Sequence, residues 1–189
     1  QLADRVNTVS ENYANELLNP YFSFGLDPIL SSERGKLRGI VNGIDYDKFD
    51  PSSDPNISQK FSLKSLNKKI KNKLAFQKEM ALEVSEDIPM VGMVTRLTGQ
   101  KGIDLVVGAA EHILNMGAQL VILGTGHPYF EDQLRNLENR RHDKMRSILK
   151  FSNEISSKIY ASSDIFLMPS KSEPCGLSQL IAMRYGVYP

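Results

Sequence analysis

The sequence has only one cysteine, Cys175, so it cannot form an internal disulfide. A chain without disulfides is typical of a reducing compartment, and we expect a cytoplasmic protein. No apolar run approaches the roughly 20 residues that a membrane-spanning helix needs. Gln1 begins a polar stretch, unlike the basic start and apolar centre of a signal peptide. These absences exclude the membrane-spanning class and favour a soluble chain.

Neither sign of charge is in excess. There are 23 lysines and arginines against 22 aspartates and glutamates, which gives a formal net charge of +1. A balanced chain has no bulk attraction for nucleic acid, membranes or acidic polymers, so any anionic ligand must be bound by local groups. The apolar share of 41% is enough for one domain or for pieces of two.

Several motifs that would define a function are also missing. No Gly-x-Ser-x-Gly elbow, Walker loop or paired-cysteine metal motif occurs. The histidines at 112, 127 and 142 lack the spacing of metal ligands, so no metal site is predicted. Cys175 is interpreted as a small buried residue rather than a nucleophile, because no histidine base accompanies it.

The first 44 residues have the pattern of an α/β unit. Residues 5–10 predict a short strand, and Ser10 or Glu11 opens a helix over 13–18. A second helix is predicted over 26–34 and a second strand over 38–41. We interpret residues 1–44 as the end of one α/β domain.

Residues 45–87, the connector, are polar. Turn residues at 50–56 precede a lysine-rich helical stretch. The lysines could bind phosphate or RNA, but interspersed apolar residues favour an amphipathic segment with a solvated basic face. The lysines are at 60, 64, 68, 69, 71, 73 and 78, and the apolar positions are Leu63, Leu66, Ile70, Leu74 and Phe76.

From Ile88 onward, short apolar runs alternate with amphipathic ones. The runs at 90–94, 120–123 and 165–168 predict buried parallel strands. Between them we expect a helix over 104–114 and another beginning at Pro128. The first helix should bury a stripe of Leu105, Val106, Ala109 and Ile113. This order predicts an α/β fold with a doubly wound parallel sheet.

The loops after these strands are the first place to look for a ligand, because doubly wound sheets bind at the carboxyl ends of their strands. Residues 95–102 hold Arg96 and Lys101 with two glycines. A forked guanidinium, an ammonium and a helix start together favour an anion site. A solvated arginine and lysine remain the alternative.

Two further loops are candidates. Gly124 and Gly126 would let a ligand approach the backbone closely, although two glycines here could serve only the turn. In residues 169–180, Glu173 could face sugar hydroxyls, while amides near Gly176 could face an anion at the start of a helix. His127, in a loop, is interpreted as solvated.

Several motifs follow one another along the chain: Val9-Ser10 with Tyr13-Ala14, Asn42-Gly43-Ile44-Asp45, Arg96-Leu97-Thr98 with Gln100-Lys101-Gly102, and Glu173-Pro174-Cys175-Gly176-Leu177 with Gln179-Leu180 and Arg184-Tyr185-Gly186. In this order they make the chain resemble bacterial glycogen synthases and plant starch synthases. The resemblance covers essentially the whole sequence and implies the GT-B architecture of two doubly wound domains. Residues 1–44 would end the amino-terminal domain, and 88–189 would begin the nucleotide-sugar-binding domain.

The resemblance assigns roles residue by residue. Arg96 and Lys101 match cations that hold the ADP phosphates, and Glu173 matches the carboxylate that faces the donor glucose. Phe151 matches an aromatic that stacks on adenine. The remaining matches are Asn42 and Gln100, which line the cleft, and Cys175, Gly176 and Leu177, whose backbone approaches sugar and phosphate. Ser172 and Gly99 depart from the family pattern, which has a large aromatic and a polar residue there.

No cofactor is implied besides the substrate ADP-glucose. Asp45-Tyr46-Asp47 has the form of a metal-binding Asp-x-Asp, but it falls in the connector. A family that uses Arg and Lys to stabilise the departing diphosphate needs no divalent cation for that step. The expected partners are ADP-glucose and an α-glucan, with no nucleic acid or membrane.

The implied function is that of a retaining glucosyltransferase that moves glucose from ADP-glucose to the non-reducing end of an α-1,4-glucan. Two alternatives remain: a related GT-B enzyme with another donor or acceptor, and a non-catalytic nucleotide- or glycan-binding module. The chain starts without methionine and stops at Pro189, where a new strand is expected. We therefore expect a segment of a longer enzyme that is inactive by itself.

Overall fold

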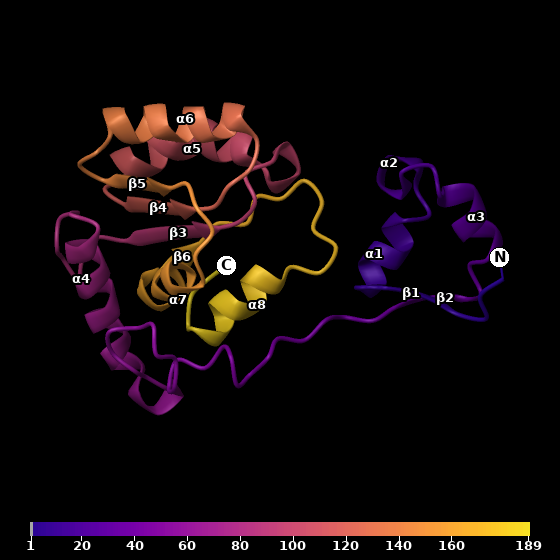
Figure 1. Cartoon of the computed structure of the whole chain (residues 1–189), viewed down its shortest axis with the longest axis horizontal. Coiled ribbons are helices and arrows are strands. Elements are labelled where there is room, and N and C mark those ends of the chain that lie inside the picture. Colours follow the sequence, from indigo (N-terminus) through magenta and orange to yellow (C-terminus); the bar gives the residue numbers. More distant parts are fainter. Residues whose placement is uncertain (1) are drawn as a thin grey trace. The chain divides into compact units, whose positions relative to one another are not determined.

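A computed structural model describes residues 2–189, and the chain divides into two compact units (Figure 1). The first unit runs to Ile44 and includes Ser172–Leu177. The second comprises Asp45–Lys171 and Ser178–Pro189.

Over its described residues, the first unit contains two parallel strands and three short helices. Of the two residues that the sequence offered as the start of the first helix, Ser10 is the cap, because its Oγ accepts the amide of Tyr13 at 3.0 Å. The short helix that begins at Pro20 was not predicted, since four residues are too few to show a helical period. The elements are β1 (Val6–Thr8), α1 (Glu11–Glu16), α2 (Pro20–Ser23), α3 (Asp27–Ser32) and β2 (Leu37–Gly39).

The second unit is built on a four-stranded parallel sheet with the order β5-β4-β3-β6. Helices α5 and α6 lie on one face of the sheet and α7 lies on the other (Figure 1). This is a doubly wound parallel sheet, as the alternation of strands and helices in the sequence predicted. The strands are β3 (Met90–Val94), β4 (Gln119–Leu123), β5 (Met145–Ile148) and β6 (Ile165–Phe166). The helices are α4 (Ile70–Glu79), α5 (Ile103–Asn115), α6 (Pro128–Arg140), α7 (Asn153–Ser162) and α8 (Leu177–Arg184), with the 3₁₀ helices η1 (Leu63–Lys69) and η2 (Gly99–Lys101).

The core of this unit lies between the sheet and α5 with α6. Ile103, Val106, Ala110 and Leu114 of α5 are buried against it. The predicted stripe was therefore partly wrong: Leu105 is 52% exposed, and Ala109 is exposed as well. The helix begins one residue earlier than expected, at Ile103, and its buried face follows positions i, i+3, i+7 and i+11 from there.

Strand β5 was not predicted because its sequence, Met-Arg-Ser-Ile, is half polar. The structure explains the polar residues at this edge strand. Arg146 is buried and donates from Nε to the Met80 carbonyl and from a terminal nitrogen to the Ala81 carbonyl, both at 2.7 Å. The guanidinium thus satisfies carbonyls at the end of α4, a task that a hydrophobicity pattern does not reveal.

The predicted amphipathic segment with a solvated basic face was only partly right. Five of its seven lysines are exposed. In η1, however, Leu63 is 91% exposed and Leu66 is 45% exposed, and in α4 Lys73 and Gln77 are buried on the face that is turned inward. Of the apolar positions, Phe76 is buried as expected. The inward face of α4 is therefore mainly polar, and hydrogen bonds hold it in place.

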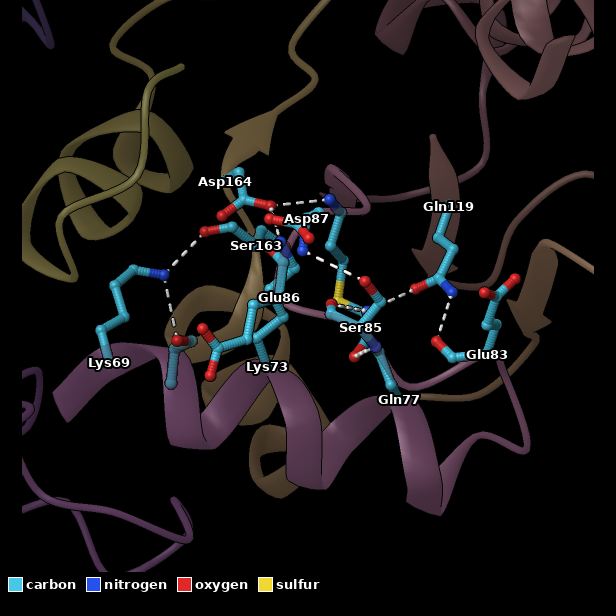
Figure 2. A network of polar contacts seen from close by, with 12 residues as sticks. Lys69, Lys73, Gln77, Glu83, Ser85, Glu86, Asp87, Gln119, Ser163 and Asp164 are labelled. Carbon is cyan, nitrogen blue, oxygen red and sulfur yellow. Dashed lines mark hydrogen bonds and ion pairs between the residues drawn. The ribbon is translucent and has the colours of Figure 1, made fainter. Parts of the chain in front are cut away.

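Figure 2 shows the polar network that this face enters. Lys73 Nζ lies 2.8 Å from Asp164 Oδ2 and 2.9 Å from the Glu86 carbonyl. Asp164 in turn accepts the amide of Met90 at 2.8 Å, at the start of β3. Gln77 donates to Gln119 Oε1 at 3.0 Å, at the start of β4. The connector helix is thereby tied to the amino ends of two neighbouring strands.

Lys69 at the end of η1 holds the end of α7. Its Nζ donates to the carbonyls of Ala161 at 3.0 Å and Ser163 at 2.7 Å (Figure 2). Burial lowers the pKa of Lys69 from 10.5 to about 8; the charge of Asp164 opposes this shift and that of Lys73 adds to it. Two of the lysines interpreted as a solvated basic face, Lys69 and Lys73, are therefore internal anchors.

The lowered pKa predicts a pH dependence of stability. The folded chain holds the Lys69 proton less tightly than the unfolded chain, so stability should rise as pH increases from about 8 towards about 10.5. Between about pH 7 and about pH 9.5 the gain is expected to be about 2 kcal/mol. Urea unfolding of the wild type and of Lys69→Met at both pH values measures it. The same pH dependence in the two proteins would contradict the assignment.

Among residues 2–189, no helix is long and apolar enough to cross a membrane. The described residues also include no group of three or more His, Cys, Asp and Glu side chains that could hold a metal ion. Asp45 of the Asp-Tyr-Asp sequence accepts the amides of Asp47 and Lys48 at 3.0 and 3.1 Å. Its carboxylate thus stabilises a local turn.

Candidate functional site

The loop after β3 continues to pair with the loop after β4. The amide of Thr95 donates to the Leu123 carbonyl at 3.0 Å, that of Leu97 to the Thr125 carbonyl at 2.9 Å, and that of His127 to the Leu97 carbonyl at 2.9 Å. Along this extended backbone successive side chains point to opposite sides. Leu97 is fully buried in the core, and the preceding residue, Arg96, is exposed at the carboxyl edge of the sheet.

Gly124 and Gly126 make this close pairing possible. A Cβ atom at Gly124 would lie 1.9 Å from the Thr95 carbonyl oxygen, and one at Gly126 would lie 2.2 Å from the Leu97 carbonyl oxygen. The amide of Gly126 donates to Glu131 Oε1 at 2.9 Å. The sequence left open whether these glycines serve the turn or a ligand, and the structure shows that both are required for the approach of two backbone loops.

A cavity of about 270 Å³ opens at the carboxyl ends of β3, β4 and β5. Three of the residues singled out from the sequence line it: Arg96 after β3, Gly124 after β4 and Phe151 after β5. Its volume is just below the usual range for small-molecule sites, and its position is the one at which doubly wound sheets bind ligands.

Phe151 is 83% exposed, and its position is fixed by the helix that follows. Ser152 caps α7, because its Oγ accepts the amide of Ile155 at 3.2 Å. The cap sets the direction in which the chain enters α7, with Phe151 directly before it. An exposed aromatic ring at the wall of a cavity can stack on a planar ligand.

Gln100 and Lys101 lie in η2, directly before α5. Gly102 has a φ of 70°, and a Cβ atom there would lie 2.1 Å from the Pro169 carbonyl oxygen. The loop after β6 therefore packs on this turn, where the amide of Lys171 donates to the Gln100 carbonyl at 2.9 Å. Lys171 Nζ also pairs with Asp104 at 2.6 Å, which lowers the pKa of that carboxyl group. Lys101 is half-buried in this packed turn.

The other predicted residues belong to the first unit. Cys175 Sγ lies 4.0 Å from the Asn42 carbonyl oxygen, so these two sequence-distant motifs meet. Glu173 is half-buried, and Gly176 is buried with a φ of 79°, a conformation that favours glycine, directly before α8. Leu177 is the first residue of α8 and is 44% exposed.

The lining residues that sequence reasoning missed include Phe49, Lys150, Tyr160 and Ile181. Burial raises the pKa of Tyr160 to about 12, and a hydrogen bond with Ser178 opposes part of this shift. Lys150 follows β5, a strand that the hydrophobic pattern did not predict, so the loop after it was not searched. No sequence pattern predicted Phe49 as a residue of this site, because it lies in the connector about 40 residues before the first strand of this sheet.

The class of the protein follows from this fold and from a family model. The model described as "Glycosyl transferases group 1" matches residues 64–189, about two thirds of the chain. The chain therefore belongs to the group 1 glycosyl transferases. A second model, "Starch synthase catalytic domain", matches residues 1–32.

Particular relatives are glycogen and starch synthases. The chain is 52% identical to a glycogen synthase of Clostridium perfringens and 51% identical to one of Streptococcus mutans, in each case over 99% of this chain and 39% of the relative. The catalytic domain of starch synthase IV from Arabidopsis thaliana, solved with ADP and acarbose, matches with a TM-score of 0.93 and 40% identity over 98% of this chain and 38% of that one. The chain thus spans about two fifths of the length of the curated relatives that it matches.

Proposed function

We propose that the protein carrying this chain is a glycogen synthase that transfers glucose from ADP-glucose to the non-reducing end of an α-1,4-glucan. The main support is the cavity at the carboxyl end of the sheet, where Arg96 and an exposed aromatic ring, Phe151, line one volume. A cation and an aromatic side chain suit the phosphate and the base of a nucleotide. The identity of about half to glycogen synthases supports the glucosyl donor and the glucan acceptor.

In the proposed reaction, Arg96 and Lys101 stabilise the negative charge that develops on the departing ADP. The resemblance to glycogen synthases assigns Glu173 to the positioning of the donor glucose, and Asn42 and Gln100 to substrate binding. The backbone groups of Cys175, Gly176 and Leu177, with those of Gly124 and Gly126, approach sugar and phosphate. The acceptor hydroxyl attacks from the face that the diphosphate leaves, and the leaving phosphate helps to remove its proton, so the anomeric configuration is retained without a protein nucleophile.

The proposal also assigns each part of the chain to a domain of the full-length enzyme. Residues 1–44 would end an amino-terminal domain, 45–87 would connect the domains, and 88–189 would begin the nucleotide-sugar-binding domain. Location in the cytoplasm accords with the single free cysteine.

A donor comparison tests the proposal. The full-length protein that carries this segment is incubated with glycogen and radiolabelled ADP-glucose or UDP-glucose. We expect ADP-glucose to label the glucan at least about ten times faster, a difference of about 1.4 kcal/mol in transition-state binding. Digestion with β-amylase, which removes maltose from non-reducing ends, should release the label if the new linkage is α-1,4. Faster labelling from UDP-glucose would contradict the proposed preference for ADP-glucose. No labelling from either donor would contradict the proposed glucosyltransferase activity.

A further inference from the structure

One guanidinium of α8 makes three contacts with the connector. Arg184 Nε donates to the Phe49 carbonyl at 3.2 Å, and a terminal nitrogen lies 3.3 Å from Asp50 Oδ2. The guanidinium carbon lies 5.2 Å from the centroid of the Tyr46 ring. Because the guanidinium presents its donors in a rigid planar fork, these contacts with three residues of one short segment hold the backbone at Phe49 in place.

Tyr185, which directly follows α8, attaches the same segment at a second point. The hydroxyl of Tyr185 donates to Asp54 Oδ2 at 2.5 Å, and both residues are buried. Desolvation raises the pKa of Tyr185, so that the phenol remains a neutral donor. The ring also packs edge-on to Phe61, with centroids 6.4 Å apart. The connector between Phe49 and Phe61 is therefore held against α8 at both ends.

Phe49 connects the contacts of Arg184 to the cavity, because it both accepts the hydrogen bond from Arg184 and lines the cavity. Its side chain lines the same cavity as Arg96 and Phe151, together with Ile181 of α8. Helix α8 thus contributes one wall residue directly, Ile181, and fixes a second, Phe49, through Arg184. A small displacement of the backbone at Phe49 would move an aromatic ring relative to the bound ligand.

We infer that Phe49 contacts the nucleoside part of the bound nucleoside diphosphate and that Arg184 is a positioning residue that holds Phe49 in place. The inference rests on the proposed nucleotide site. An apolar ring suits the base and ribose, since the charged phosphates are assigned to Arg96. Arg184 itself does not line the cavity, and its hydrogen bond to the Phe49 carbonyl is the contact by which it positions this wall residue.

A double-mutant cycle on ADP binding tests this coupling in the full-length protein that carries the segment. Isothermal titration calorimetry gives the Kd and the binding stoichiometry of the wild type, Phe49→Ala, Arg184→Gln and the double variant. We expect each single variant to raise the Kd about 5- to 20-fold, and the double variant to be within about twofold of the weaker single one, because residues that act as a unit are not additive. Arg184→Lys, which keeps the charge but not the fork, should give an intermediate Kd.

The matched control is Arg135→Gln, which removes an exposed arginine that pairs with Asp132 on α6 at 2.5 Å. Its Kd should equal that of the wild type. A purely structural role of Arg184 would lower the stoichiometry and the Tm at an unchanged Kd, which would overturn the inference. So would additive losses, or an unchanged Kd in Phe49→Ala, while the wild type binds ADP. If the wild type does not bind ADP, the proposed function fails and this inference fails with it.

Discussion

Arg96→Ala and Lys101→Ala are each expected to lower the kcat of glucosyl transfer by about 10²- to 10³-fold. Removing one preorganised group that stabilises a developing anion typically has an effect of this size. Arg96 is exposed at the wall of the cavity, and Lys101 lies in the turn before α5, where the dipole of a 13-residue helix adds positive potential. Steady-state kinetics of the full-length protein with ADP-glucose and glycogen measure the loss.

Two controls separate charge from packing in this experiment. Arg96→Lys keeps the charge but cannot form the fork onto two phosphate oxygens, so we expect activity between those of the wild type and Arg96→Ala. Arg135→Ala removes an exposed cation of α6 and should leave kcat unchanged. Near-normal activity of both Arg96→Ala and Lys101→Ala would remove these residues from the diphosphate site.

Glu173→Gln is expected to abolish most of the activity while the Tm changes little. Glu173 is half-buried in the loop that precedes α8, and the proposed task of its carboxylate is to position the donor glucose. The amide has the same shape but no charge, so an effect through the substrate should appear in kcat and kcat/KM rather than in stability. Kinetics and thermal unfolding of the same preparation provide both quantities.

Glu33→Gln is the matched control for Glu173. Glu33 also belongs to the first unit, and its carboxylate pairs with Lys36 at 2.8 Å on the surface. A surface ion pair contributes little to stability, so neither Tm nor kcat should change appreciably. A large fall in Tm for Glu173→Gln would instead identify Glu173 as a structural carboxylate.

Several elements could be read directly from the sequence because local signals agreed with the tertiary structure. The apolar run at Met90–Val94 is strand β3 with the bounds expected, and Pro128 is the first residue of α6. Parallel strands buried on both faces require continuous apolar runs, and Pro suits the first turn of a helix. The same reasoning located the loops that contribute Arg96 and Gly124 to the cavity.

The hydrophobic pattern of the sequence did not reveal the packing of α4 or the strand β5, because polar side chains make many of their internal contacts. Lys69 at the end of η1, and Lys73 and Gln77 of α4, hold this segment in place; their partners are backbone carbonyls and side chains about 8 to 94 residues away. Strand β5 contains the buried Arg146 for the same reason. The sequence does not distinguish a lysine that anchors the end of a helix from a lysine in solvent, because the difference lies in the surroundings of the side chain.

The sequence by itself determined the fold class and the three loops in which to look for a site, since both depend on local periodicity and on the chemistry of single residues. Only the tertiary structure decided which side chains share the cavity. Phe49, Arg96 and Phe151 are separated by about 50 residues at each step and meet because parallel strands end at one edge and the connector is attached to α8. It also decided that Gly124 faces a neighbouring carbonyl, since close approach between loops depends on the register of β3 and β4.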